Sequence, residues 1–137
     1  MRSPASGLKL AGLFYSRKAF DSMEKKLRIP PGKIRRLIQK MGACSATDKI
    51  TVDGKDVGWM CRVQPETAED SGWRFLAGDE SPDYLDNPDN HGIYDVNTIC
   101  NYDQSIIPFL HAAPGTAYER DPSTGVFVKV DFDGHLY

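Results

Sequence analysis

The sequence predicts an α+β domain, in which an antiparallel sheet with short helices is preceded by an N-terminal helical extension. Two observations support this prediction. Before residue 42 apolar residues recur at helical spacing, whereas segments 57–63, 73–77 and 126–132 alternate apolar and polar residues as strands do. Glycine, proline, asparagine and aspartate cluster between those segments, as the turns of an antiparallel sheet require.

Residues 1–41 form a basic extension with two expected helices. The first covers residues 17–27, where apolar side chains follow helical spacing. Two prolines end it, and the second of them, Pro31, suits the first turn of another helix that reaches Met41. Gly42 is a suitable helix stop, and we place the start of the domain there.

The sheet is expected within residues 42–137. Asp53 and Gly54 form a strong hairpin signal because both residue types accept a positive φ, which predicts strands at 49–52 and 57–63. A strand is expected at 73–77, followed by an irregular stretch at 78–92 with one helical turn and by a strand or a helix at 93–99. A short helix at 105–111, capped by Asp103, precedes an extended segment at 116–119 and a turn at 121–125. The last expected element is a strand at 126–132 with four side chains inward: Val126, Val128, Val130 and Phe132.

The net charge of −2 hides a strong asymmetry along the chain. Residues 1–41 contain eleven Lys or Arg and two Asp or Glu, a net of +9, whereas residues 42–137 contain six and seventeen, a net of −11. A basic arm on an acidic domain is therefore expected. The arm could contact nucleic acid, dock on the acidic domain of this or another copy, or pack its helices through Ile34 and Leu37.

Length, cysteine content and hydropathy indicate a single cytoplasmic domain. A chain of 137 residues suits one domain. The chain contains three cysteines, Cys44, Cys61 and Cys100. An odd number without metal-ligand spacing argues against a disulfide framework and a zinc site. No apolar run is long enough to cross a bilayer, and residues 8–15 are not followed by a signal-peptide cleavage site. We expect no membrane contact.

Motifs of catalysis and of cofactor binding are absent from the sequence. It contains no GxSxG, P-loop, GxGxxG or HExxH pattern. His91, His111 and His135 share no metal-ligand spacing, and a histidine without a converging partner is more often structural than catalytic. We therefore expect no catalytic residue, no metal and no cofactor.

A long acidic stretch carries most of the functional information. Between Glu66 and Asp103 there are ten carboxylates and one base, Arg74. A calcium loop would need tighter spacing, an invariant glycine and a terminal glutamate, which this stretch lacks. Two interpretations of the acidic stretch remain, namely a solvated loop and a docking face for a basic partner. Interleaved aromatic residues and rigid turn formers favour docking.

The favoured function is therefore a non-catalytic protein-binding domain with a basic partner. One alternative is a small carboxylate- or metal-dependent hydrolase in which Asp79, Glu80 and Asp95 converge. Another is a nucleic-acid adaptor acting through residues 1–41, since the acidic domain would repel the phosphates of a duplex. The residues expected to form or support the contact surface are Trp73, Asp79, Glu80, Tyr84, Asp86, Asp89, Tyr94 and Asp95.

Two runs of sequence, EDSGWRFLAGDE and YLDNPDNHGIYDVNTICNYDQ, resemble the bacterial immunity protein 33 family, formerly a domain of unknown function. The resemblance covers about residues 42–120 and leaves out residues 1–41. It implies an α+β domain encoded beside toxins of bacterial polymorphic toxin systems, which binds and neutralises a cognate toxin. The residues that match its motifs are Asp70, Gly72, Trp73, Phe75, Gly78, Asp79, Glu80, Asn87, Pro88, Asp89, Asn90, Tyr94, Asp95 and Asn101.

Overall fold

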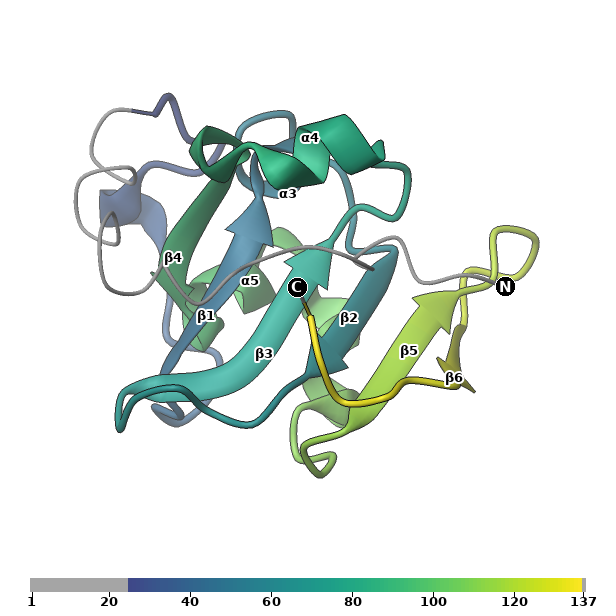
Figure 1. Ribbon diagram of the computed structural model, residues 1–137. Coiled ribbons are helices and arrows are strands. Elements are labelled where there is room, and N and C mark those ends of the chain that lie inside the picture. Colours follow the sequence, from purple (N-terminus) through teal and green to yellow (C-terminus); the bar gives the residue numbers. More distant parts are fainter. Residues whose placement is uncertain (1–24, 137) are drawn as a thin grey trace.

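The computed structural model describes residues 25–136 and contains a six-stranded sheet of order β4-β1-β3-β2-β5-β6 (Figure 1). β1 and β3 run parallel, and all other neighbouring strands are antiparallel. The α+β class is confirmed, but the expectation of an antiparallel sheet is wrong, because the sheet is mixed.

The strands are β1 (Ala43–Thr47), β2 (Trp59–Arg62), β3 (Asp70–Leu76), β4 (His91–Asp95), β5 (Thr116–Arg120) and β6 (Phe127–Val130). The helical elements are η1 (Pro31–Lys33), α3 (Asp48–Thr51), α4 (Pro82–Asp86), η2 (Pro88–Asn90), α5 (Val96–Tyr102) and η3 (Gln104–Phe109), where η marks a 3-10 helix.

The parallel strand β1 is the element that sequence patterns did not assign. Its residues are small, only one of them is β-branched, and nearly all are buried, so no alternation of apolar and polar residues marks it. β1 pairs with β3 on one side and with β4 on the other. It therefore lies inside the sheet, where a strand is covered on both faces and polar positions are not needed.

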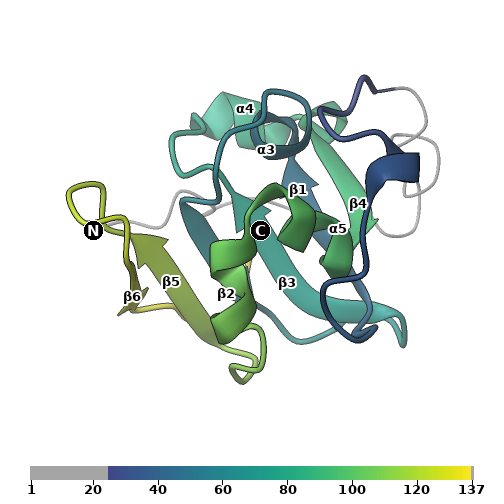
Figure 2. The ribbon, with the colours of Figure 1, turned by 180° about the vertical axis from the view of Figure 1, so that it is seen from behind.

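The first face of the sheet is covered by α5 and η3, which lie in front of the strands in Figure 2. Their buried side chains Val96, Ile99 and Ile106 pack with Trp73 and Phe75 of β3 in one apolar cluster. The two rings of β3 stack with centroids 5.8 Å apart. Burial of side chains of this size is the main favourable term that holds the helices on the sheet.

The second face is covered in part by the C-terminal segment 131–136, which crosses the sheet in Figure 1. Phe132 of this segment packs edge-on against Trp59 of β2, with ring centroids 5.9 Å apart. Trp59 and Cys61 join this second cluster, whereas Met60 joins the first. The alternation predicted for residues 57–63 is therefore confirmed within β2, whereas Val57, expected on the face of Trp59, packs in the first cluster.

The hairpin expected at Asp53 and Gly54 is wrong. The chain forms the short helix α3 at residues 48–51, where a strand was predicted. Gly54 has a φ of 79° and donates its N–H to the carbonyl of Ile50 at 3.1 Å. A glycine with positive φ ends a helix as readily as it closes a hairpin, and tertiary packing selects the first use here.

The last strand is β6, and its buried face differs from the prediction. Phe127 is buried, whereas Val126 and Val128 are 58% and 50% exposed. The inward assignment of those two valines is wrong, although Val130 and Phe132 do pack against the second cluster. Phe127 packs with Phe109 in the first cluster, so β6 buries residues on both of its faces.

The stretch from residue 78 to residue 111 largely follows the sequence prediction. It contains the expected helical turn, which is α4. The ambiguous segment 93–99 is divided between a strand and a helix, since β4 ends at Asp95 and α5 begins at Val96. The helix expected at 105–111 is the 3-10 helix η3, and Asp103 caps it by accepting a hydrogen bond from the N–H of Ser105 at 3.1 Å.

The helix expected at 31–41 is wrong. Only the 3-10 turn η1 forms, and residues 34–41 contain no helix. The reason lies in α5, whose Asn97 accepts hydrogen bonds from the N–H groups of Leu37 and Ile38 at 2.7 and 3.2 Å and donates one to the carbonyl of Arg35 at 2.8 Å. These bonds satisfy backbone groups that a helix would otherwise pair. The earlier helix, predicted at 17–27, lies almost entirely outside the described residues.

Replacing Asn97 by alanine should loosen the segment around Leu37 and Ile38. The substitution leaves backbone groups in a part-buried site without partners, and we expect a loss of about 2 kcal/mol in the free energy of unfolding. Urea unfolding measures the loss, and amide hydrogen exchange should quicken at Leu37 and Ile38. Asn101→Ala is the matched control, because its exposed bond to Arg35 should contribute less. Unchanged exchange in Asn97→Ala would contradict this role of the asparagine.

Candidate functional site

The exposed carboxylates between β3 and β4 lie on a loop that is held by side-chain caps. Ser81 begins α4 by accepting a hydrogen bond from the N–H of Tyr84 at 3.1 Å, and Asn87 begins η2 in the same way through the N–H of Asp89 at 3.0 Å. Asn90 donates its side-chain amide to the carbonyl of Tyr84 at 2.9 Å. The loop is therefore ordered by its own turn formers, as the sequence predicts.

Four carboxylates on this loop are exposed, and we call them the acidic rim: Asp79, Asp83, Asp86 and Asp89. Asp83 lies in the first turn of α4, where a negative charge suits the exposed N–H groups of the helix. Within residues 25–136, neither Asp83 nor Asp86 forms a salt bridge or a side-chain hydrogen bond. These two side chains therefore present negative charge to solvent.

Asp79 is exposed but already carries partners. Its carboxylate accepts hydrogen bonds from Lys55 at 2.8 Å and from Lys49 at 3.1 Å. Those bonds lower the pKa of Asp79 from its usual value. Both lysines lie outside the stretch 66–103, so the charge of that stretch alone overstates the negative field near Asp79.

Tyr84 supports the rim from a half-buried position. The ammonium of Lys49 lies 5.3 Å from the centroid of its ring, within the range of a cation–π contact. Burial, followed by the nearby carboxylates of Asp48 and Asp53, raises the pKa of Tyr84 to about 12. Its hydroxyl therefore stays protonated at neutral pH and can donate a hydrogen bond.

Glu80 lies behind the rim and is 6% exposed. One carboxylate oxygen accepts hydrogen bonds from the hydroxyl of Thr47 at 2.6 Å and from the N–H of Ala77 at 2.7 Å, and the other accepts one from the N–H of Gly78 at 2.8 Å. Glu80 thus joins the end of β1 to the end of β3. It positions the loop that carries the rim and is not itself available to a partner.

The two aromatic residues expected at the surface belong to the core. Trp73 is 0% exposed, and its indole N–H donates a hydrogen bond to the carbonyl of Leu110 at 3.0 Å. Tyr94 is 8% exposed, and its hydroxyl donates to Thr51 at 3.3 Å. Neither ring can contact a partner while the domain is folded, so each supports the surface only through packing.

The carboxylates proposed for a hydrolase do not converge. Asp79 is bound to two lysines, and Glu80 is fully engaged by Thr47 and the backbone. Asp95 pairs with Ala43 at the far end of β4 and caps α5 through the N–H of Asn97 at 2.9 Å. That catalytic arrangement is therefore not formed. Among residues 25–136, no three His, Cys, Asp or Glu side chains are placed to hold a metal ion.

Other residues of the predicted motifs stabilise the sheet. Asp70 and Arg74 form a buried, two-pronged ion pair with both N···O distances at 2.9 Å. Burial is the largest single influence and would raise the pKa of Asp70, but the hydrogen bonds and charge of Arg74 and the backbone N–H groups of Glu66 and Gly72 together outweigh it, and the pKa is lowered. Gly72 has a φ of 90°, and a Cβ there would lie 2.2 Å from the carbonyl oxygen of Val63.

The described part of the basic extension binds its own domain. Lys25 donates to the carboxylate of Asp48 and to the carbonyl of His91, both at 2.7 Å. Arg28 donates to the carbonyl of Asp53 at 2.7 Å. Part of the positive charge is thus directed at the domain, and the apolar residues that pack against the first cluster are Leu27, Leu37, Ile38 and Met41.

The three cysteines are buried and free. Burial raises the pKa of all three thiols, that of Cys100 to about 11. A thiol in this state is a poor nucleophile at neutral pH. No helix within residues 25–136 combines the length and the apolar character needed to cross a bilayer.

Comparison with protein families returned one match. The family model described as the Immunity protein Imm33 domain matches residues 44–131, which is more than half of the chain. This match confirms the resemblance seen in the two sequence runs and extends beyond residue 120. No curated protein and no solved structure matches the chain.

Proposed function

Because the chain belongs to the Imm33 family of immunity protein domains, we propose that it neutralises a cognate bacterial toxin in the cytoplasm by stoichiometric binding. The acidic rim is the proposed contact surface, and the toxin is expected to present Lys and Arg to it. The observation that carries the proposal is the pair Asp83 and Asp86, which are exposed, ionisable and free of salt bridges within the described residues. Their charge is available to a cationic partner.

The rim is suited to binding because its backbone is fixed before a partner arrives. The caps from Ser81 and Asn87 and the bond from Asn90 to Tyr84 hold α4 and η2 in place. A preformed surface loses little conformational entropy on association. The buried carboxylate of Glu80 adds to this order by joining the loop to β1 and β3.

Neutralisation by this surface would work by occlusion. Carboxylates on the rim pair with cations around the cleft of the toxin, and the bulk of the domain then excludes the substrate. A concentrated negative field also speeds the encounter with a positive partner. The mechanism needs no catalytic group in the immunity protein. The hydrolase alternative would need Asp79, Glu80 and Asp95 to converge, and they do not.

Survival of cells that express the toxin encoded beside this gene tests the proposal. Wild-type chain should protect, and the double variant Asp83→Lys, Asp86→Lys should lose protection. Reversal of two contact charges replaces attraction by repulsion, and we expect about 100-fold weaker binding. Glu69→Lys is the matched control, because Glu69 is exposed and immediately precedes β3, at the opposite end of that strand from the rim.

The variants must be compared at equal amounts of soluble protein. Loss of protection in the rim variant, together with full protection by Glu69→Lys, would support the acidic rim. Equal protection by the rim variant and wild type would show that toxin binding uses another surface. Absence of protection by wild-type chain would refute the immunity function against that toxin.

A further inference from the structure

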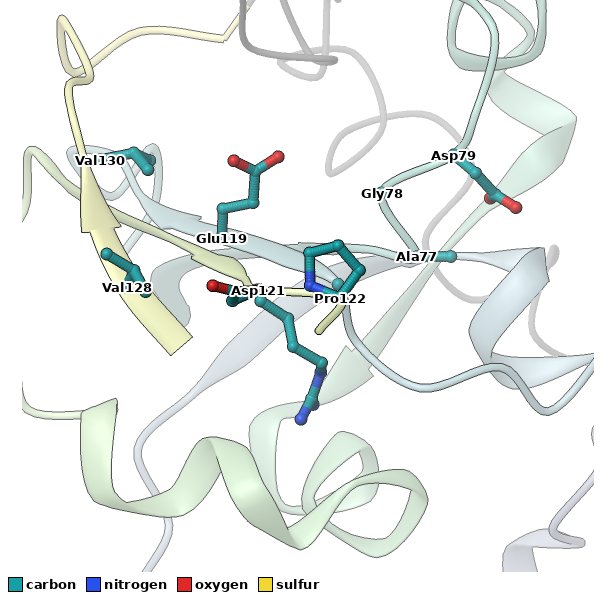
Figure 3. A pocket seen from close by; sticks show the side chains of 10 residues that line it. Ala77, Gly78, Asp79, Glu119, Asp121, Pro122, Val128 and Val130 are labelled. Atoms are coloured by element: carbon teal, nitrogen blue, oxygen red, sulfur yellow. The ribbon is translucent and has the colours of Figure 1, made fainter. Parts of the chain in front are cut away.

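A second surface lies beside the acidic rim, where β5 and β6 meet the turn after β3. It is a pocket of about 640 Å³ (Figure 3). Gly58, Ala77 and Gly78 contribute backbone to it. A Cβ on Gly58 would lie only 1.9 Å from the carbonyl oxygen of Ala77, so the two backbones touch and leave no room for side chains there. The pocket therefore lies where Gly58 and segments 77–79, 119–122 and 128–130 meet.

The walls of this pocket are apolar on one side. Val128 and Val130 of β6 line it, and Pro122 approaches from the turn after β5. Val128 is 50% exposed and its neighbour Val126 58% exposed, which makes them the most exposed large apolar side chains of the described residues. Exposed apolar side chains grouped beside a pocket are typical of a contact surface.

Glu119 is the charged group at the centre of the pocket. It pairs across the sheet with Trp59 on one side and with Val128 on the other, so its carboxylate shares their face. Figure 3 shows the side chain rising between the two valines of β6 and Gly78. Within residues 25–136, Glu119 forms no salt bridge and no side-chain hydrogen bond.

Arg120 also lines the pocket but does not neutralise Glu119. Its guanidinium donates to the carbonyls of Val57 and Gly125 at 2.9 Å and to the carboxylate of Asp103 at 2.7 Å. It also lies over the ring of Phe127, 4.3 Å from the centroid, which places it on the first face of the sheet. Its donors are thus directed away from the pocket.

Asp121 adds a second negative charge at the edge of the pocket. Its carboxylate accepts hydrogen bonds from the N–H and the hydroxyl of Ser123 at 2.8 and 2.7 Å, and these bonds lower its pKa from the usual value. Asp79 points away in Figure 3, toward its lysine partners. The uncompensated charge of the pocket is therefore that of Glu119 and Asp121.

We propose that this pocket binds a Lys or Arg side chain from an extended segment of the toxin. The methylene stem packs on Val128, Val130 and Pro122, while the cationic head pairs with Glu119 and Asp121. Long basic side chains combine an apolar stem with a charged head in this way. The inference rests on the proposed function for the identity of the partner, and Asp79, which borders both surfaces, allows one partner to cover the rim and the pocket together.

Titration of the ¹⁵N-labelled full chain with the peptide acetyl-Val-Arg-Val-amide tests the pocket without the toxin. Amide shifts should change at Gly58, Gly78, Glu119 and Val128, and the citrulline counterpart, which lacks the charge, should bind less tightly. Glu119→Gln should weaken the peptide about fivefold, the upper range for an exposed ion pair. The control Glu69→Gln should bind as wild type does.

Equal shifts with the arginine and citrulline peptides, shifts spread over the surface, or unchanged binding by Glu119→Gln would overturn the proposal. Toxin binding provides the second readout. If the peptide occupies the pocket but Glu119→Gln binds the toxin normally, the toxin does not use the pocket and this inference fails, whereas the proposed function stands. If the toxin does not bind wild-type chain at all, the proposed function fails, and the peptide result still decides whether the pocket takes a basic side chain.

Discussion

Asp70→Ala should lower the free energy of unfolding by about 3–5 kcal/mol, because it leaves the guanidinium of Arg74 buried without its main counter-charge. Arg74 is 0% exposed, and Asp70 also accepts hydrogen bonds from the N–H groups of Glu66 and Gly72. Domains of this size are stable by only about 5–15 kcal/mol. Urea unfolding should therefore show a much lower midpoint, or the variant should be insoluble.

Two controls separate the ion pair from a general effect of losing a carboxylate. Asp86→Ala, on the exposed rim, should change stability by no more than about 0.5 kcal/mol. The double variant Asp70→Leu, Arg74→Met removes both charges and should be more stable than Asp70→Ala. A variant Asp70→Ala as stable as wild type would show that the buried pair contributes nothing.

The ion pair of Asp70 and Arg74 also predicts how the stability of the domain depends on pH. The pKa of Asp70 is lower in the folded chain than the unfolded value of about 3.9. The stabilisation by this group is therefore complete above about pH 4, and it is lost as the pH falls through the lowered folded pKa. Wild type should lose stability in that range more steeply than Asp70→Asn, which has no carboxylate to protonate. Parallel losses in the two proteins would argue against a lowered pKa.

Gly58→Ala should cost at least about 3 kcal/mol, for a steric reason. The added Cβ would lie 1.9 Å from the carbonyl oxygen of Ala77, a backbone atom that cannot rotate away. Movement of Gly58 would also disturb its bonds to Leu76 and Arg120, which join β3 and β5 on either side of β2. Thermal unfolding should show a large fall in Tm.

Gly32→Ala is the matched control for this substitution. No atom lies within 4 Å of a Cβ at Gly32, and its φ is not positive. The change should alter stability by less than about 1 kcal/mol. Similar effects of the two substitutions would show that the contact at Gly58 relaxes easily, and would contradict the rigid pocket described above.

The sequence predicted best those elements whose pattern is local. Strand β2 alternates between two apolar clusters, and Asn87 and Asn90 order their loop because asparagine stabilises turns wherever it occurs. These features depend on neighbours along the chain. They are readable without knowledge of the tertiary structure.

The errors arose where distant residues decide the local structure. The segment before Gly42 has helical spacing, but Asn97, some 60 residues later, binds its backbone and holds it extended. Gly54 suits a hairpin and a helix end equally, and the packing of α3 selects the second. β1 has no alternation because both of its faces are covered.

The sequence indicated which residues of the site are charged or aromatic, but it did not indicate which of them are exposed. Asp86 and Asp89 are exposed as expected, whereas Glu80, Trp73 and Tyr94 are buried. Residue type alone does not separate a surface aromatic from a core one. Asp79 forms ion pairs with Lys49 and Lys55, which come from an earlier part of the chain. Nothing in the sequence around these two lysines indicated that contact.

Calorimetric titration of the purified toxin with wild-type chain and with the variant Asp83→Lys, Asp86→Lys tests the central claim most directly. The acidic rim predicts one toxin bound per wild-type chain and an affinity about 100-fold lower for the variant at low salt, with a smaller difference as salt screens the charges. Equal affinity of the two proteins, when both are folded, would contradict the claim that this surface binds the toxin.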